Sequence, residues 1–405
     1  MKIRTAKVLV TCPGRNYVLL KIETDSGAYG WGDGTLNGRE LAVAALLEQH
    51  IIPLLVGRDP DRIEDCWQYL TRGSYWRGGP IQMTAVAAVD AALWDIKGKL
   101  AGRPVYSLLG GRCRDEVLCY THCGGSNPEE TVANARKAAA AGFKALRLQT
   151  AIPGLSGTYG KGGGQEAAAA TWGEPGGPPQ VELFEPGPYL RIIPPLFELA
   201  RRELGPEIEL LHDVHHKLTP VEAARLARDL EPHRLFFLED PVKPEYAHLL
   251  STIRRHSVTP IAIGELFQWI PDFQRLLGEY ALDYIRCDLG HAGGITAGLK
   301  IAHLAEPHAV KTAWHGPGDI SPIMHAANLH LDLAVSNFGI QEMVFFPPAV
   351  EKVIRGGPRF EAGSLVLDDR PGLGTEVDEA EAARYPYRPA YLPVARRSDG
   401  SVHDW

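Results

Sequence analysis

Three short segments decide the fold, LLHDVHH (residues 210–216), FFLEDP (236–241) and AIGEL (262–266), because each joins an apolar run to a carboxylate. The carboxylates are Asp213, Glu239 and Glu265, and successive members are 26 residues apart. That step fits one strand, one helix and their loops. Eight β-rich runs alternate with helical stretches, at 117–120, 145–148, 208–211, 235–238, 260–263, 284–287, 310–313 and 338–341. This alternation predicts an α/β fold of the (β/α)8 barrel type.

In such a barrel the carboxyl ends of the strands share one face, so the three carboxylates are expected to converge. Three neighbouring carboxylates need a cation to stay ionised, and a set of oxygen ligands without cysteine suits Mg²⁺. A single acidic residue at a strand end often caps the following helix instead. Three in register favour a shared role, so we expect Asp213, Glu239 and Glu265 to bind one Mg²⁺ per chain.

The rest of the chain suggests three parts. Residues 1–115 contain β-rich runs at 3–11, 17–23 and 29–32 and helical stretches at 38–55 and 80–100, which predicts an α+β capping domain. Residues 116–355 form the predicted barrel, and 356–405 are expected to return to the cap. The segment GKGGGQEAAAATWGEPGGPPQ (160–180) belongs to an expected lid loop at about 152–188, because so long a loop in a compact fold is usually functional or disordered.

Composition excludes several classes of protein. The 405 residues include 42 basic and 49 acidic side chains, a net charge of -7, and show no basic run, so a nucleic-acid partner is not expected. No apolar stretch approaches the roughly 20 residues that span a bilayer, so no membrane role is expected. Six cysteines without a C-x-x-C pair favour a cytoplasmic protein. We expect a homo-oligomer that acts on a small molecule.

Several motifs then identify a resemblance that covers nearly the whole chain. The spaced carboxylates, LWDIKGKLAGRPVYSLLGG and HAGGI resemble the enolase superfamily, in its mandelate-racemase-like branch. TCPGRNYV, TLNGRE, TYG, LLHDVHHKLTP, HGPGDISP and NFGIQE are similar to the mannonate dehydratase group, which includes starvation-sensing-protein-like members. The resemblance implies a hydro-lyase that converts D-mannonate or D-gluconate into 2-keto-3-deoxy-D-gluconate. Mg²⁺ would stabilise the enediolate that forms when the α-proton leaves.

The resemblance also implies roles for individual residues. Relatives often carry a Lys-x-Lys base after the second strand, whereas this chain has Arg147 and Gln149 there. In the mannonate group an arginine and a loop tyrosine act as the base, which correspond to Arg147 and Tyr159. A guanidinium favours the phenolate, so this pairing has a physical reason. His215 is the expected general acid, since two residues after Asp213 on a strand it would point to the same face. The implied substrate-binding residues are Asn37, His122, Arg286, His315, Asp319 and Glu342.

Two departures leave alternatives open. Pro317 stands where efficient mannonate dehydratases carry a small residue such as alanine, so low or promiscuous activity is expected. Asp288 stands where racemase-like relatives place the partner of the seventh-strand histidine, so an Asp288 and His315 dyad could be the base for another acid sugar. A catalytically silent binding or regulatory protein of the same fold is the third alternative.

Overall fold

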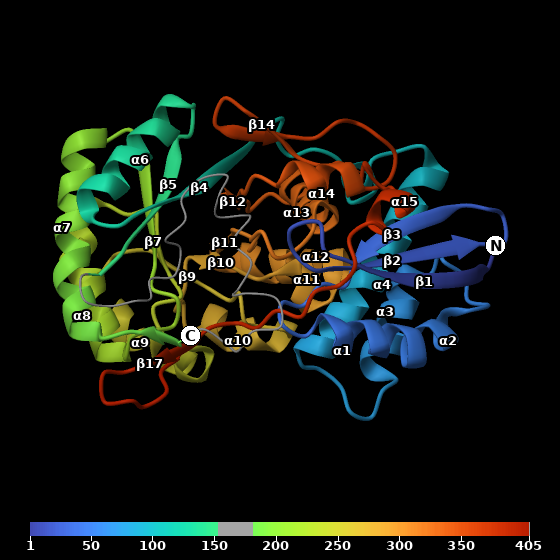
Figure 1. Cartoon of the computed structure of the whole chain (residues 1–405), viewed down its shortest axis with the longest axis horizontal. Coiled ribbons are helices and arrows are strands. Elements are labelled where there is room, and N and C mark those ends of the chain that lie inside the picture. The colour runs from blue at the N-terminus through green and yellow to red at the C-terminus, as the bar shows by residue number, and fades with distance from the viewer. Residues whose placement is uncertain (153–180, 405) are drawn as a thin grey trace.

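The computed structural model describes residues 1–152 and 181–404 of the chain. A cap built from the first hundred residues lies at one end, a barrel fills the rest, and the final segment runs from the cap across the barrel (Figure 1).

The cap consists of an antiparallel sheet packed on a long helix. Its strands, β1 (Ile3–Thr11), β2 (Tyr17–Thr24) and β3 (Tyr29–Asp33), pair in that order. Its helices are α1 (Glu40–Leu46), the π-helical turn η1 (Leu47–Ile51), α2 (Ile52–Leu55), α3 (Ile63–Arg72), α4 (Pro80–Ala101) and α5 (Val105–Leu108). The β-rich runs predicted at 17–23 and 29–32 form an antiparallel hairpin, β2–β3. The helix expected over 38–55 is instead divided by η1, and α3 was missed.

Two glycines let the cap sheet approach α4. A Cβ atom at Gly32 would lie 1.9 Å from the carbonyl oxygen of Ala88, and one at Gly30 would lie 2.2 Å from that of Ala92. Both distances are far below van der Waals contact, so only glycine fits here. The close approach fixes the end of β3, and with it Asp33, relative to the barrel.

Eight parallel strands close the barrel. They are β4 (Val117–Gly125), β5 (Ala145–Thr150), β7 (Glu209–Asp213), β8 (Phe237–Glu239), β9 (Ile261–Ile263), β10 (Tyr284–Ile285), β11 (Lys311–Thr312) and β12 (Gln341–Glu342). The order from β4 through β5 and β7 to β11 is continuous, β12 pairs with β4, and a parallel bridge from Thr312 to Phe338 closes the ring. All eight predicted strands are confirmed.

Helices surround the strands. They are α6 (Pro128–Ala140), α7 (Pro186–Leu204), α8 (Pro220–Leu230), α9 (Leu250–Arg254), α10 (Ile270–Gly278), α11 (Leu289–Ala292), α12 (Gly294–Ala305), α13 (Pro322–Ala334) and α14 (Pro348–Val353), with short 3-10 turns η3 (Glu231–His233), η4 (Pro244–Leu249) and η5 (Glu306–His308). The sequence explains α8 well. Thr219 and Glu222 form a capping box around Pro220, and the side chains of Leu226 and Leu230 are buried.

The end of the chain closes over both parts. The strand β13 (Ile354–Gly356) pairs with β16 (Thr375–Val377), and β14 (Arg359–Glu361) pairs with β15 (Ser364–Val366), which adds to the start of β4. After α15 (Glu379–Ala382) the chain contacts the cap. Thr11 donates to the carbonyl of Ala382 at 2.9 Å, and the Asn16 side chain exchanges hydrogen bonds with the backbone of Arg388 at 2.6 and 3.1 Å.

The expected lid loop ends earlier than predicted. The strand β6 (Val181–Leu183) pairs in parallel with β17 (Val394–Arg396), and α7 already begins at Pro186. Residues 181–183 are therefore a strand, because a strand late in the chain supplies their backbone partners, and residues 186–188 belong to a helix. Residues 153–180, including Tyr159, lie outside the described part of the chain. Within the described part, no helix is long and apolar enough to cross a membrane.

Candidate functional site

The barrel interior is closed by an apolar layer that lies below the site. The layer consists of Tyr120, Ala145, Leu211, Phe237, Ala262, Ala313 and Ile340. Residues two positions further along a strand point to the same side. Two residues after each member of this layer except Ala262, and two residues after Tyr284 of β10, the chain has a polar side chain. These are His122, Arg147, Asp213, Glu239, Arg286, His315 and Glu342. The polar ring therefore stands on the barrel mouth because of strand periodicity.

Glu265 departs from this period by one residue. The position two after Ala262 is Gly264, whose φ of +135° is accessible to glycine and strained for other residues. A Cβ atom there would lie 2.8 Å from the Phe273 ring. The backbone turns at this glycine, and the next residue, Glu265, supplies the carboxylate.

Arg147 bridges the carboxylates of three strands. Its Nη1 atom lies 3.2 Å from Asp213 Oδ2, 3.5 Å from Glu239 Oε2 and 3.8 Å from Glu342 Oε1, and its side chain is 1% exposed. Nη2 lies 3.2 Å from His122 Nδ1. Burial alone would disfavour the charged guanidinium, but Asp213 and Glu239 hold the pKa of Arg147 well above its usual value.

Arg286 holds the opposite side of the ring. Its Nε donates to Glu239 Oε1 at 2.6 Å and its Nη2 to Glu342 Oε2 at 2.8 Å. Nη1 donates to the carbonyls of Ala313 and Trp314, both at 3.0 Å. These bonds fix Arg286 in one orientation, so the ring is rigid here.

Three histidines face Glu265. His216 Nε2 lies 3.0 Å from Glu265 Oε1, His215 Nε2 lies 3.4 Å from the same atom, and His315 Nε2 lies 3.3 Å from Oε2. Burial opposes ionisation of Glu265, yet the imidazoles of His315 and His215 hold its pKa well below the usual value. Burial likewise disfavours a charged His216, but Asp240 and Glu265 raise its pKa to about 10.

The dyad considered from the sequence is formed in the structure. His315 Nδ1 lies 2.8 Å from Asp288 Oδ2. Although burial acts against a charged ring, Glu265 and Asp288 raise the pKa of His315 to about 10. His315 is thus a hydrogen-bond donor at neutral pH.

His215 lies in the site, but for a different reason than expected. β7 ends at Asp213, and His215 and His216 have left-handed φ values of +53° and +64°. The chain thus turns rather than continuing as a strand. The turn is closed by the His215 backbone N–H, which donates to Asp213 Oδ1 at 2.7 Å. Burial lowers the pKa of the His215 imidazole well below its usual value.

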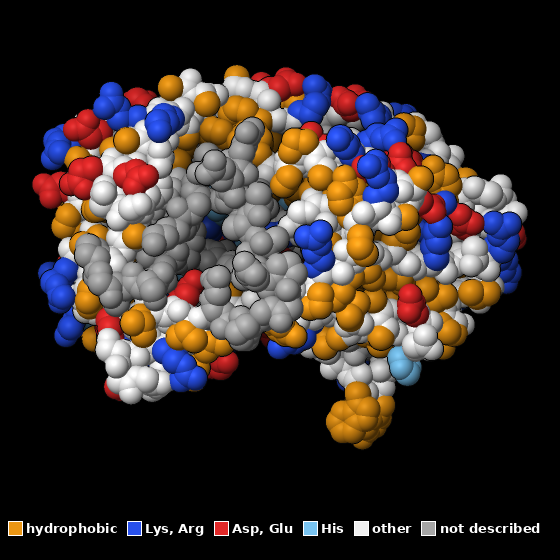
Figure 2. All heavy atoms as spheres, in the orientation of Figure 1, with side chains coloured by type: hydrophobic (Ala, Val, Ile, Leu, Met, Phe, Trp, Pro, Cys, Tyr) orange, Lys and Arg blue, Asp and Glu red, His pale blue; other side chains and the backbone are white. Residues whose placement is uncertain are grey.

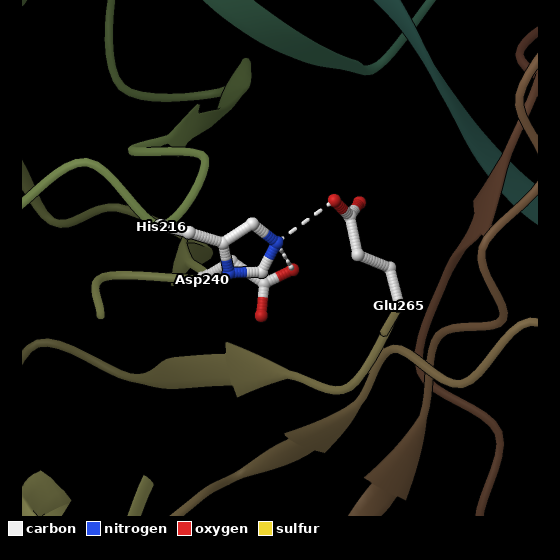
Figure 3. A group of neighbouring side chains, drawn as sticks. All are labelled: His216, Asp240 and Glu265. Carbon is white, nitrogen blue, oxygen red and sulfur yellow. Dashed lines mark hydrogen bonds and ion pairs between the residues drawn. The ribbon is translucent and has the colours of Figure 1, made fainter. Parts of the chain in front are cut away.

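Two overlapping sets of side chains could hold a metal. The ligand atoms of His216, Asp240 and Glu265 all lie within 4.8 Å of one another (Figure 3). His216 and Asp240 were missed by sequence reasoning, although both directly follow a residue that it identified. Among the described residues only this group comes so close together; the predicted set, Asp213, Glu239 and Glu265, shares Glu265 with it and stays a prediction.

The cap adds polar groups beside the barrel mouth. Asn37 Nδ2 donates to Asp319 Oδ2 at 2.9 Å, so two of the predicted substrate-binding residues contact each other across the two parts of the molecule. His122 Nε2 lies 2.6 Å from Glu342 Oε1, which brings two more together. The predicted base partner of Arg147, Tyr159, lies outside the described residues.

Family models match both parts of the chain. The mandelate racemase / muconate lactonizing enzyme N-terminal domain matches residues 5–110, and the enolase C-terminal domain-like family matches residues 130–381. This chain belongs to the enolase superfamily. Its place in the mandelate racemase / muconate lactonizing enzyme branch, expected from the motifs, is confirmed.

Relatives of this enolase-superfamily chain match it over its full length. It is 52% identical to a protein from Caulobacter sp. (strain K31) named D-mannonate dehydratase, with all of both chains covered. It is 51% identical to a D-galactonate dehydratase family member from Streptomyces bingchenggensis, over 98% of this chain and 96% of that one. A crystal structure of an enolase from Pantoea ananatis with bound D-gluconate and magnesium has a TM-score of 0.92 and 41% identity, with all of both chains covered.

Proposed function

We propose that this chain is a magnesium-dependent dehydratase that removes water from D-mannonate, D-gluconate or both and yields 2-keto-3-deoxy-D-gluconate. The observation that carries the proposal is the buried ring in which Arg147 bridges Asp213 and Glu239 at the barrel mouth. The similarity to proteins named D-mannonate dehydratase, and the D-gluconate and magnesium in the Pantoea ananatis enolase, support the substrate class and the metal.

Asp213, Glu239 and Glu265 are our proposed ligands for Mg²⁺. Asp213 Oδ2 and Glu239 Oε2 are buried and pair with Arg147 Nη1 at 3.2 and 3.5 Å, so a bound cation would share or replace this pairing. Burial and the neighbouring Glu239 also raise the pKa of Asp213 well above its usual value, which a bound cation would reverse. When bound, Mg²⁺ supplies positive charge beside the substrate carboxylate, where charge builds up as the α-proton leaves.

The alternative set suits Mg²⁺ less well. It includes the nitrogen of His216, whereas Mg²⁺ prefers oxygen ligands. One oxygen of Asp240, Oδ1, already accepts the backbone N–H of Gly264 at 3.2 Å. We therefore assign His216 and Asp240 to holding Glu265 and the strand ends in position.

The proton transfers are assigned to Arg147, Tyr159 and His215. Arg147 lends positive charge to the base, for which Tyr159 stays the prediction from the sequence. His215 would give the proton to the departing hydroxyl. Burial lowers the pKa of the His215 imidazole, so the proton that it gives to the hydroxyl would first be taken up from solvent, favoured by the negative charge of a bound substrate carboxylate.

The proposed substrate contacts are paired with one another in the structure. Asn37 bonds Asp319, and Glu342 bonds both His122 and Arg286. Sugar hydroxyls and a carboxylate offer the same donors and acceptors, so binding would exchange these bonds for substrate bonds. His315, beside Glu265, is the sixth proposed contact.

We also propose that the chain turns over mannonate with low efficiency. Pro317 has no backbone N–H to offer, and its carbonyl already accepts a hydrogen bond from His325 Nε2 at 3.0 Å. The loop that carries Asp319 therefore has little freedom to adjust to a substrate.

The test is turnover of a panel of acid sugars with Mg²⁺, followed by NMR detection of the 2-keto-3-deoxy product. Formation of that product from D-mannonate or D-gluconate, abolished by chelation, supports the proposal. Bound magnesium without turnover of any acid sugar would instead favour the silent binding or regulatory protein.

A second candidate uses the Asp288 and His315 pair, whose 2.8 Å contact favours it. Here His315, whose pKa, despite burial, Glu265 and Asp288 raise to about 10, would first have to lose its proton and would then remove the α-proton of another acid sugar. Exchange of the α-proton with solvent deuterium separates the candidates. Tyr159→Phe eliminates exchange if the tyrosine is the base, whereas His315→Asn does so, with Tyr159→Phe harmless, if the dyad is.

A homo-oligomeric state and a cytoplasmic location also stay predictions. Hydrophobic side chains gather over the cap on the face shown in Figure 2. Tyr75 and Trp76, between α3 and α4, are 88% and 85% exposed and contact each other edge to face. Large aromatic side chains are enriched at subunit interfaces, so this pair supports self-association.

A further inference from the structure

The loop from Gly316 to Ser321, which joins β11 to α13, carries Asp319 and is held by the barrel at its start. The Gly316 backbone N–H donates to Glu342 Oε2 at 2.8 Å. His325 Nε2, on α13, donates to the Pro317 carbonyl at 3.0 Å. The first two residues of the loop are thus fixed from below.

The cap holds the rest of the same loop. The hydroxyl of Tyr17 donates to the Gly318 carbonyl at 3.1 Å. The Ser321 backbone N–H donates to Asp33 Oδ2 at 2.6 Å. These two bonds lie on either side of Asp319 in the sequence, so its backbone is held from both directions by cap strands β2 and β3.

Both cap residues are themselves firmly placed. Tyr17 and Asp33 are each 1% exposed. Asp33 Oδ1 accepts the backbone N–H of Thr35 at 2.8 Å, which leaves Oδ2 directed to the loop. Asp33 ends β3, whose position is fixed by the glycine contacts with α4.

The cap also aims the Asp319 side chain. Asn37 Nδ2 donates to Asp319 Oδ2 at 2.9 Å, and Arg15 Nη1 lies 3.6 Å from Asp319 Oδ1. Both oxygens therefore face cap residues, and the position of the backbone decides how far the carboxylate reaches toward the barrel mouth.

We propose that Tyr17 and Asp33 are positioning residues that set the place of Asp319 against the substrate, so that the cap helps to select among acid sugars. The inference rests on the proposed function, in which Asp319 binds a sugar hydroxyl. Neither residue is among the proposed ligands, proton donors or substrate contacts, so each acts through the loop. A displacement of about 1 Å at a substrate contact can cost on the order of 100-fold in rate, whereas one hydrogen bond matters little to global stability.

The test compares Tyr17→Phe with Tyr29→Phe. Tyr29 is also a cap tyrosine whose hydroxyl bonds outside the cap, to Glu376 Oε2 at 3.1 Å, but it does not contact the loop. The kcat and KM of each variant are measured on D-mannonate, D-gluconate and D-galactonate; D-gluconate differs from each of the other two in the configuration of one hydroxyl. Melting temperature is recorded with and without Mg²⁺.

Tyr17→Phe is expected to raise KM roughly 10-fold on at least one sugar and to change the ratio of kcat/KM values between sugars, with kcat less affected. Tyr29→Phe should leave that ratio unchanged. Asp33→Asn should shift the ratio in the same direction as Tyr17→Phe. Because Asp33 is buried, its replacement can prevent folding, and in that case the result for Tyr17→Phe alone tests the inference.

Equal losses on all sugars together with a lower melting temperature would mean a merely structural role and would overturn the inference. An unchanged ratio in Tyr17→Phe would also overturn it, while wild-type turnover would leave the proposed function standing. Absence of wild-type turnover on every sugar overturns the proposed function, and this inference with it.

Discussion

Replacement of Glu239 by glutamine tests which side chains hold the metal. The amide oxygen can still accept the hydrogen bond from Arg286 Nε, which is 2.6 Å long in the wild type. The amide N–H2 then faces Arg147 Nη1, which lies 3.5 Å from Glu239 Oε2. Loss of the ion pair with Arg147, and of the charge on the acceptor for Arg286, should lower the free energy of unfolding without metal by about 1–2 kcal/mol.

The effect on metal-dependent stabilisation should be larger. At a Mg²⁺ concentration of about 100 times its Kd, binding stabilises the wild type by about 2.7 kcal/mol. Loss of a ligand is expected to weaken binding by at least the roughly 100-fold seen for outer partners, which leaves about 0.4 kcal/mol at the same concentration. For a chain of this size that difference corresponds to a fall in the thermal shift from roughly 3 °C to below about 1 °C.

The assay is thermal unfolding with increasing Mg²⁺, with each variant referred to its own metal-free midpoint. Glu342→Gln is the matched control, because Glu342 also pairs with Arg286, at 2.8 Å, but is not a proposed ligand. It should keep the wild-type metal shift and lose turnover. A full metal shift in Glu239→Gln, together with loss of the shift in Asp240→Asn, would refute our choice of ligands and assign the metal to the set that includes His216.

Three further predictions concern the stability of the fold and its self-association. Gly32→Ala should lower the free energy of unfolding in urea by about 3 kcal/mol or more, because the new Cβ atom would stand 1.9 Å from the Ala88 carbonyl oxygen. His212 is neutral when folded, since burial lowers its pKa from 6.5 to about 4, so its contribution is present above about pH 6.5 and is lost as the pH falls toward 4. Between pH 6.5 and pH 4 the free energy of unfolding should therefore fall by roughly 3 kcal/mol because of His212. Urea unfolding of His212→Gln at the same two pH values should lack this part of the fall. Trp76→Ala should shift light-scattering mass toward the monomer, and an unchanged mass would remove the aromatic pair as support for self-association.

The barrel and its carboxylates could be predicted because both follow local rules. A strand shows as a short apolar run, and period two carries the inward side from Leu211 to Asp213 and from Phe237 to Glu239. No local rule places Arg147 between those carboxylates, since its contacts join strands that are distant in the sequence. The same holds for His215, whose left-handed backbone depends on the bond to Asp213.

Long-range pairing explains the other errors. Residues 181–183 look like part of a glycine- and proline-rich loop, and only their pairing with residues 394–396 makes them a strand. Tyr17 and Asp33 look like ordinary strand residues of the cap, and their partners stand about three hundred residues away. Such contacts leave no periodic signal in a single sequence.

The contacts of Thr11 with Ala382 and of Asn16 with Arg388 mean that two coding stretches, one before the barrel and one after it, together encode the surroundings of the cap. A single recombination event between two related genes would pair the cap of one with the closing segment of the other, and these contacts would be mismatched. To exchange caps intact, two crossovers are required, one before the barrel and one after it. We therefore expect that chimaeras with matched ends and a foreign barrel fold better than chimaeras with one junction.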